Sequence, residues 1–75
     1  MQKLKIGDKF YYTGDMANHA GFGVITARHN QFIDAKLDDG RVLKGIYTAM
    51  FEEGSGQRFK LIDQYNAERA KALNG

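Results

Sequence analysis

The sequence predicts a mainly β protein in which five short antiparallel strands form a small barrel and a short α-helix follows at the C-terminus. Polar and apolar residues alternate with a period of two in several short segments, as in half-buried strands. Turn-forming residues separate these segments. Asp39-Gly40 is the strongest such signal, because a tight hairpin needs a positive φ, which Gly adopts at little steric cost. The helix is predicted because Ala, Glu, Arg, Lys and Leu predominate after Asp63.

Length and composition indicate a single domain, with the barrel at residues 1–62 and the helix at residues 63–75. The chain has 75 residues, of which 43% are hydrophobic, so it is too apolar to be disordered. A chain of this size buries only about 60% of its unfolded surface, and oligomerisation is one way to add to its core. It has no cysteine, which excludes disulfides, zinc knuckles and thiol nucleophiles, and no apolar run near the ~20 residues that span a bilayer. We expect a cytoplasmic protein without a membrane partner.

Strands are expected at residues 10–13, 22–28, 32–38, 41–47 and 58–62, where aromatic, β-branched and alternating residues occur. Residues 14–21 lack periodicity and should form a loop. Residues 48–51 either extend the fourth strand or form one helical turn. Gly23 and Gly45 lie inside predicted strands, which indicates a bulge, a bend or a close backbone approach of the kind a small barrel needs to turn a corner.

The predicted helix covers residues 64–73. Asp63 is expected to be its N-cap, because the carboxylate can accept hydrogen bonds from the free amide groups of the first turn. Ile62 and Ala67 occupy the positions of a hydrophobic staple. A helix of about ten residues is unstable alone in water, so it should pack against the barrel through Tyr65 and Leu73.

Two segments carry a resemblance to a known fold family. The run Gly7-Asp8-Lys9-Phe10 and the later run Gly21-Phe22-Gly23-Val24-Ile25 are similar to SH3-like barrels, most closely to KOW and Tudor-type modules. In those modules a Gly-Asp opens the first strand and a Gly-x-Gly-hydrophobic segment opens the second. The turn at residues 38–41 also fits. The resemblance covers residues 5–62 and implies the fold and a tendency to bind nucleic acid or proteins, but no reaction.

The charge pattern is compatible with a nucleic-acid interface. Eleven Lys and Arg against nine Asp and Glu leave a net charge of +2. Basic residues on strands or strand ends could position a phosphate backbone, and two tyrosines could stack on bases. These candidates are Arg28, Lys36, Lys44, Arg58 and Lys60, with Tyr11 and Tyr12. Asp34 and Asp38 flank Lys36 on the same predicted face, however, so the cross-strand ion pairs of a solvated sheet would explain the pattern as well.

The turn at Asp39-Gly40 decides whether Lys36 and Lys44 can act together. A two-residue turn would pair Lys36 with Leu43 and place Lys44 on the opposite face of the sheet. A one-residue bulge at Gly40 would bring the two lysines onto one face, because a slip of one residue reverses every side chain. The basic face therefore requires the bulged turn.

Two other site types have weaker support. Five aromatics with Asp15 at the rim could form a Tudor-like pocket for a cation, but in so small a barrel most aromatics are simply core residues, because each buries a large apolar area. The five are Tyr11, Tyr12, Phe22, Tyr47 and Phe51. Asp15 and His19 alone do not make a metal site, so we expect neither metal nor cofactor.

An enzymatic function is not expected. Ile46-Tyr47 resembles the Val-Gln-Ile-Tyr segment that lines the pore of the tetrameric type II dihydrofolate reductases. Lys44-Gly45 stand here in place of Val-Gln, which removes the amide that would hydrogen-bond cofactor or substrate. No Ser-His-Asp or paired-carboxylate arrangement stands out. The sequence thus favours a non-enzymatic binding module with DNA or RNA as ligand. The alternative is a protein-interaction or self-assembling module.

Overall fold

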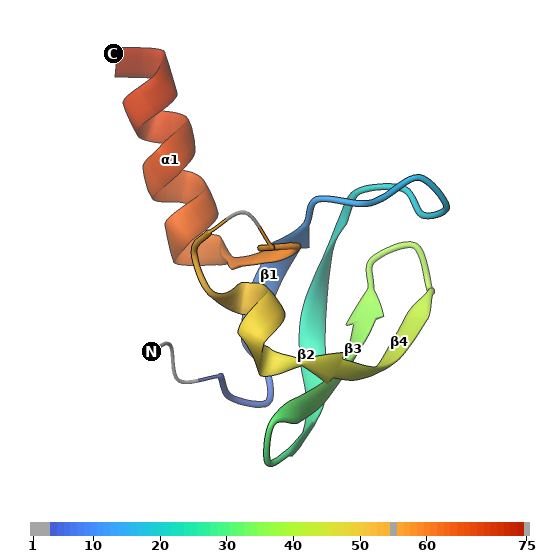
Figure 1. Ribbon diagram of the computed structural model, residues 1–75. Helices are drawn as coiled ribbons and strands as arrows, with labels where there is room; N and C mark the ends of the chain where they lie inside the picture. The colour runs from blue at the N-terminus through green and yellow to red at the C-terminus, as the bar shows by residue number, and fades with distance from the viewer. Residues whose placement is uncertain (1–3, 55, 75) are drawn as a thin grey trace.

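A computed structural model describes residues 4–54 and 56–74. Its five antiparallel strands form one curved sheet in the order β4-β3-β2-β1-β5, and an α-helix projects from one end of it (Figure 1). The elements are β1 (Lys9–Tyr12), β2 (Gly21–His29), β3 (Phe32–Leu37), β4 (Val42–Tyr47), the 3₁₀ helix η1 (Thr48–Phe51), β5 (Phe59–Leu61) and α1 (Ile62–Asn74). The predicted mainly β fold with a C-terminal helix is confirmed.

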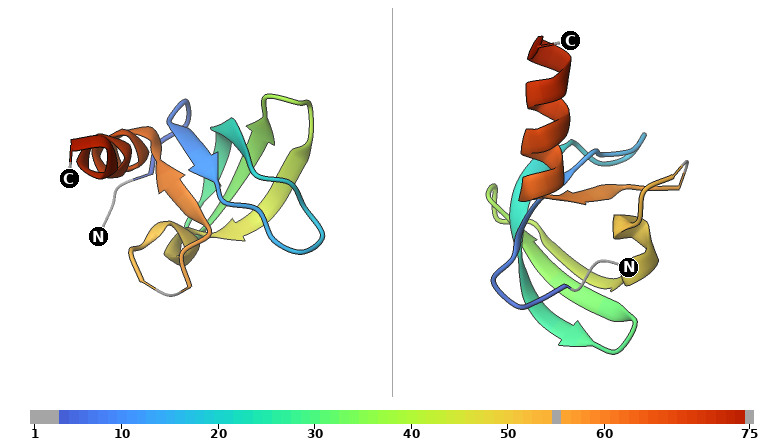
Figure 2. Two further views of the ribbon diagram at one scale, coloured as in Figure 1. Left: turned by 90° about the horizontal axis from the view of Figure 1, so that it is seen from above. Right: turned by 90° about the vertical axis from the view of Figure 1, so that its left-hand side faces the viewer.

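The sheet curls around its core without closing into the expected barrel (Figure 2). Within the described residues no strand pairing joins β4 to β5. The chain between these two strands forms η1 instead of extending β4, which settles the structure of residues 48–51. The backbone N–H of Arg58 donates to the carbonyl of Met50 at 2.9 Å, so η1 and the start of β5 are held together across the open side.

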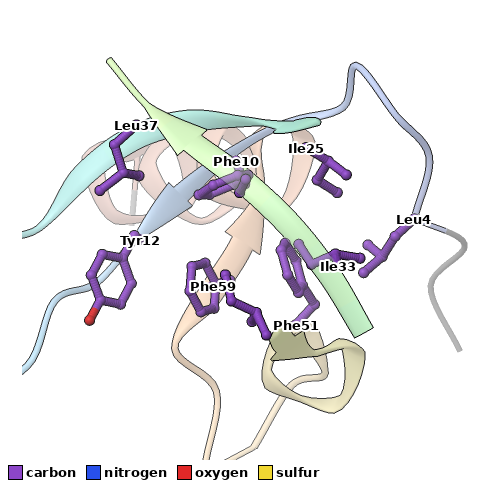
Figure 3. Close-up of a cluster of buried hydrophobic side chains, with 10 residues drawn as sticks. Leu4, Phe10, Tyr12, Ile25, Ile33, Leu37, Phe51 and Phe59 are labelled. Carbon is purple, nitrogen blue, oxygen red and sulfur yellow. The ribbon is translucent and has the colours of Figure 1, made fainter. Parts of the chain in front are cut away.

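The core lies on the concave face of the sheet and combines four aromatic rings with aliphatic side chains (Figure 3). Phe10 is fully buried, and its ring meets those of Phe51 and Phe59 edge-on at centroid distances of 5.7 and 5.4 Å. Burying each such side chain contributes about 1.5–3 kcal/mol. The complete set of buried apolar residues is Leu4, Phe10, Tyr12, Ile25, Ile33, Ala35, Leu37, Ile46, Phe51 and Phe59. Because Phe51 belongs to η1, this helix closes the core where no strand does.

Gly23 makes room for this core and does not form a bulge. It pairs regularly with Phe10 and with Leu37, and the register of β2 with β3 shifts further along, between Ile25 and Ala27. A Cβ atom on Gly23 would lie 2.7 Å from the carbonyl oxygen of Lys36 and 2.9 Å from the ring of Phe10. Of the alternatives expected for this glycine, the close approach is the one observed.

The helix differs from its prediction at both ends. It begins at Ile62, so Asp63 lies in the first turn and is not the N-cap, and Ile62 is itself helical and does not precede the N-cap as a staple residue would. The Asp63 carboxylate remains favourable there because the helix N-terminus carries partial positive charge. Tyr65 packs on the sheet as expected, with its ring 4.6 Å from that of Tyr11. Leu73 is 77% exposed, so only the first turns of the helix contact the sheet (Figure 1).

The β3–β4 hairpin has the bulged turn and not the two-residue turn. Gly40 donates its N–H to the carbonyl of Leu37 at 2.9 Å, and the N–H of Leu37 donates to the carbonyl of Arg41 at 2.8 Å. Gly40 has φ of +97°, so it is the left-handed residue of a three-residue loop. The extra residue pairs Lys36 with Val42.

We expect Gly40→Val to lower the free energy of unfolding by about 1–2 kcal/mol, because an L side chain is strained in the left-handed region. A Cβ at this position meets no atom within 4 Å, so the loss is conformational and not steric. Asparagine tolerates the left-handed region better than valine, so Gly40→Asn should lower the free energy of unfolding less. Urea unfolding of the three proteins measures both losses. Equal losses, or an unchanged midpoint for Gly40→Val, would argue against the turn.

Candidate functional site

The convex surface of the sheet, opposite the core, is called here the outer face. A row of alternating lysine and valine crosses four strands on it. Lys9 of β1 stands opposite Val24 of β2, Val24 opposite Lys36 of β3, and Lys36 opposite Val42 of β4. Side chains at directly opposed positions lie on the same side of a sheet. Lys9, Lys36 and Val42 are exposed, so the row presents cations and apolar surface together.

Lys44 lies on the same face, next to a second bulge. The register of β3 with β4 shifts by one at Asp34, which therefore stands opposite both Lys44 and Gly45. Gly45 absorbs the extra residue with φ of +66°. Lys44 follows Val42 by two residues in regular strand and so shares its face. The bulged turn at Gly40 thus places Lys36 and Lys44 on one face, as the basic-face hypothesis requires, and the second bulge turns Tyr47 to this face as well.

Asp34 lies between these lysines, but its carboxylate is held by other groups. It accepts a hydrogen bond from the Gly45 N–H at 3.1 Å and lies 3.3 Å from Nε2 of His29. The Gly45 N–H, then His29 and the charge of Lys44, hold the pKa of this carboxyl below its usual value. Among the described residues neither Lys36 nor Lys44 is in an ion pair. Cross-strand pairing of Lys36 with its aspartate neighbours is therefore not what the sheet shows.

Aromatic residues flank the basic part of the outer face at both ends. At one end Tyr11 is covered, because its ring packs against Phe22 at 5.0 Å and against Tyr65 at 4.6 Å. At the other end Phe32 and Tyr47 stand directly opposite each other, with rings 4.6 Å apart. Since Tyr12 and Phe51 lie in the core, the five aromatics proposed for a cation pocket do not meet in one place.

The remaining predicted basic residues have structural roles or lie elsewhere. Arg28 donates to the carbonyls of Leu4 at 2.5 Å and Asn30 at 3.3 Å, which fastens the N-terminal segment to β2. Lys60 pairs with Glu68 at 2.6 Å and so ties β5 to the helix. Arg58 is exposed beside Tyr12, Asp15 and Met50, at the open side of the sheet.

Tyr12 cannot stack on a ligand, because it is buried and its hydroxyl donates to Asp15 at 3.0 Å. Burial, and then this bond, raise the pKa of Tyr12. The Asp15 carboxylate also accepts the N–H groups of Ala17 and Asn18, each at 2.8 Å, and the Ala17 bond contributes most to its lowered pKa. Asp15 thus organises the loop between β1 and β2. No group of three or more His, Cys, Asp or Glu that could hold a metal occurs in the described part of the chain.

The structure brings together two of the seven predicted residues, Lys36 and Lys44, and adds four more. These are Lys9, Val42, Phe32 and Tyr47. The alternation of Lys9 with the core residue Phe10 was a usable signal in the sequence. The pairing of Phe32 with Tyr47 could not be predicted from the sequence in this way, because it depends on both bulges of the β3–β4 hairpin.

The carboxylates make the stability pH-dependent. Asp15, Asp34, Asp39 and Glu68 all have a lowered pKa, each through hydrogen bonds or a nearby cation. A lowered folded pKa gives stability that is present above the unfolded pKa, near 4, and is lost as the pH falls through the folded value. Urea unfolding should therefore show a free energy that falls below about pH 4. Asp15→Asn should flatten this dependence, and an unchanged slope would contradict the role given to Asp15.

Comparison with protein-family models, with curated proteins and with solved structures found no match for this chain. No helix in the described residues has the length and apolar character needed to cross a membrane.

Proposed function

We propose that this chain is a small, non-enzymatic nucleic-acid-binding module that binds through the outer face of its sheet. The observation that carries the proposal is the set of three exposed lysines, Lys9, Lys36 and Lys44, which three different strands place on one surface. Phosphate groups are the anions that such a face would neutralise, and contacts to phosphate supply most of non-specific affinity. The resemblance of residues 5–62 to SH3-like barrels of KOW and Tudor type agrees with this proposal.

The strength of binding follows from the number of cations. Neighbouring strands lie about 4.8 Å apart, so Lys9 and Lys36, two strands apart, have Cα atoms roughly 10 Å apart. Long lysine side chains at this spacing can reach separate phosphates of one backbone. Three contacts give a slope of log K against log salt of about −2 to −3. We expect weak binding that is strongest at low salt, with a dissociation constant of roughly 1–100 μM.

Reversing two charges tests the location of the site. Lys36→Glu with Lys44→Glu should reduce the affinity for a short labelled DNA or RNA at about 50 mM salt by tenfold or more, because two of three phosphate contacts become repulsive. Arg69→Glu with Lys71→Glu, on the exposed part of α1, changes the net charge equally and serves as the matched control. Fluorescence anisotropy measures both affinities, and circular dichroism checks the fold. Equal losses in the two variants would show that binding follows net charge and not this face.

One observation favours a protein-interaction or self-assembling module as the second candidate. Val42 and Met50 are exposed apolar residues beside the free edge of β4, which has a strand partner on one side only in the described sheet. Lys44 and the bulge at Gly45 act against strand addition at this edge, since charge and bulges protect edge strands. Salt separates the two candidates, because phosphate binding weakens steeply as salt rises and an apolar interface does not. Wild-type protein that binds neither DNA nor RNA at about 50 mM salt would remove the first candidate.

A further inference from the structure

The Phe32–Tyr47 pair is an aromatic surface at the end of the outer face that α1 does not reach; at the other end Phe22 is also exposed, but its ring packs edge-on against Tyr65 of α1. The strand alternation that buries Ile33 and Ile46 turns both rings outward. Their centroids are 4.6 Å apart with an interplanar angle of 39°, so the two rings make a tilted platform. Tyr47 is 51% exposed, whereas Tyr11 at the other end of the same face is covered by the helix residue Tyr65.

A hollow in the surface opens beside this platform and carries hydrogen-bonding groups. Its lining includes Phe32 and Tyr47 together with the polar residues Gln31, His29 and Thr48. The backbone N–H of Thr48 donates to the carbonyl of Gln31 at 2.9 Å, which joins two of the lining residues. The side chain of Gln31 is exposed, so its amide can donate and accept. An aromatic surface beside an amide and a hydroxyl suits a flat ring with polar edges.

The cations lie at a distance from the platform that suits the backbone of such a ligand. Lys36 follows Phe32 by four residues on β3, about 13 Å at the rise of a strand. Lys44 precedes Tyr47 by three residues on β4. Glu52 and Arg28 also line the hollow and carry opposite charges, and Arg28 already donates to the carbonyls of Leu4 and Asn30. The two lysines form no ion pair among the described residues, so the backbone of a bound chain should run from the platform over them.

From this arrangement we infer that the ligand is a single-stranded nucleic acid, with a base stacked on Tyr47 and Phe32 and its neighbouring phosphates at Lys44 and Lys36. The inference rests on the proposed function and makes it more specific. In a duplex each base face is covered by the next base pair, so an aromatic platform is of use only to an unstacked base. Stacking tolerates every base, and Gln31 can add a preference through base edges.

The absence of tryptophan from the sequence allows a direct test. Tyr47→Trp places the sole indole on the platform and keeps its aromatic character. An oligothymidylate of about 20 nucleotides, longer than a typical site of 4–16 nucleotides, is titrated at about 50 mM salt. The duplex of the same strand with oligoadenylate is titrated in parallel. We expect saturable quenching of the tryptophan by the single strand, and an affinity at least tenfold above that for the duplex.

Leu73→Trp is the matched control, because it places the indole at the exposed end of α1. It should bind a labelled oligothymidylate with the same anisotropy curve but without quenching. Tyr47→Ala should weaken single-strand binding by about tenfold or more, and Tyr47→Phe should restore it.

The outcomes separate this inference from the proposed function. Binding of single strand and duplex with equal affinity, without quenching of the Tyr47→Trp variant, would overturn the inference and leave a phosphate-binding face. Absence of binding to either polymer would overturn both, and would direct attention to a protein partner. An equal affinity of Tyr47→Ala and wild type for the single strand would likewise contradict stacking on the platform.

Discussion

The left-handed conformation of Gly40 is the constraint on which the two faces of this sheet depend. The extra residue of its loop pairs Lys36 with Val42 and the core residue Ala35 with Leu43. A hairpin one residue shorter would have paired Lys36 with Leu43 and so moved the partly buried Leu43 to the solvent side. The bulged turn therefore keeps Leu43 on the core side of the sheet and Lys36 on the solvent side at the same time.

A similar device acts at the other end of β4. Continued alternation would carry Ile46 to the outer face, where it could not bury its side chain. The bulge at Lys44-Gly45 returns Ile46 to the core and leaves Lys44 outside. The N–H of Gly45 donates to the carboxylate of Asp34, so the same bulge also engages the one acidic group between the lysines. Packing and the basic character of the face therefore have a common origin.

The open sheet is stabilised by aromatic packing where strand pairing ends. Phe51 of η1 is fully buried, and its ring stacks on that of Phe59 at 5.0 Å. Gln57 donates to the carbonyls of both phenylalanines, at 2.9 and 3.0 Å. The core side of the molecule is thereby filled by the chain itself. The outer face is not covered in this way, except by Tyr65 at one end.

The sequence was sufficient for the elements and insufficient for their register. The period of two and Asp39-Gly40 located all five strands. Both the two-residue turn and the bulged turn use Gly40 in the same way, however, so local signals could not choose between them. Tyr11 and Tyr12 were both predicted to stack on bases, but Tyr12 is buried in the core. Neighbouring residues in a strand point to opposite faces of the sheet, and only the register decides which of the two is buried.

Contacts between distant residues limited the prediction of the site. The partner of Arg28 is the carbonyl of Leu4, 24 residues away, and the partner of Lys60 is on the helix. Neither partner can be predicted from the local sequence pattern. Arg28 and Lys60 were therefore expected to be as free to bind phosphate as Lys36. The helix start was misplaced because Ile62 is a β-branched residue directly after β5, which is typical of a strand, and yet it takes helical conformation.

A nuclear magnetic resonance titration tests the central claim, that the outer face is a binding surface, most directly. ¹⁵N-labelled wild-type protein is titrated with a short single-stranded oligonucleotide at low salt, and the amide shifts are assigned to residues. The account requires the largest shifts around Lys36, Lys44 and Tyr47, with the exposed end of α1 unchanged. Shifts confined to α1 or to the open side near Met50, with the outer face unaffected, would contradict it.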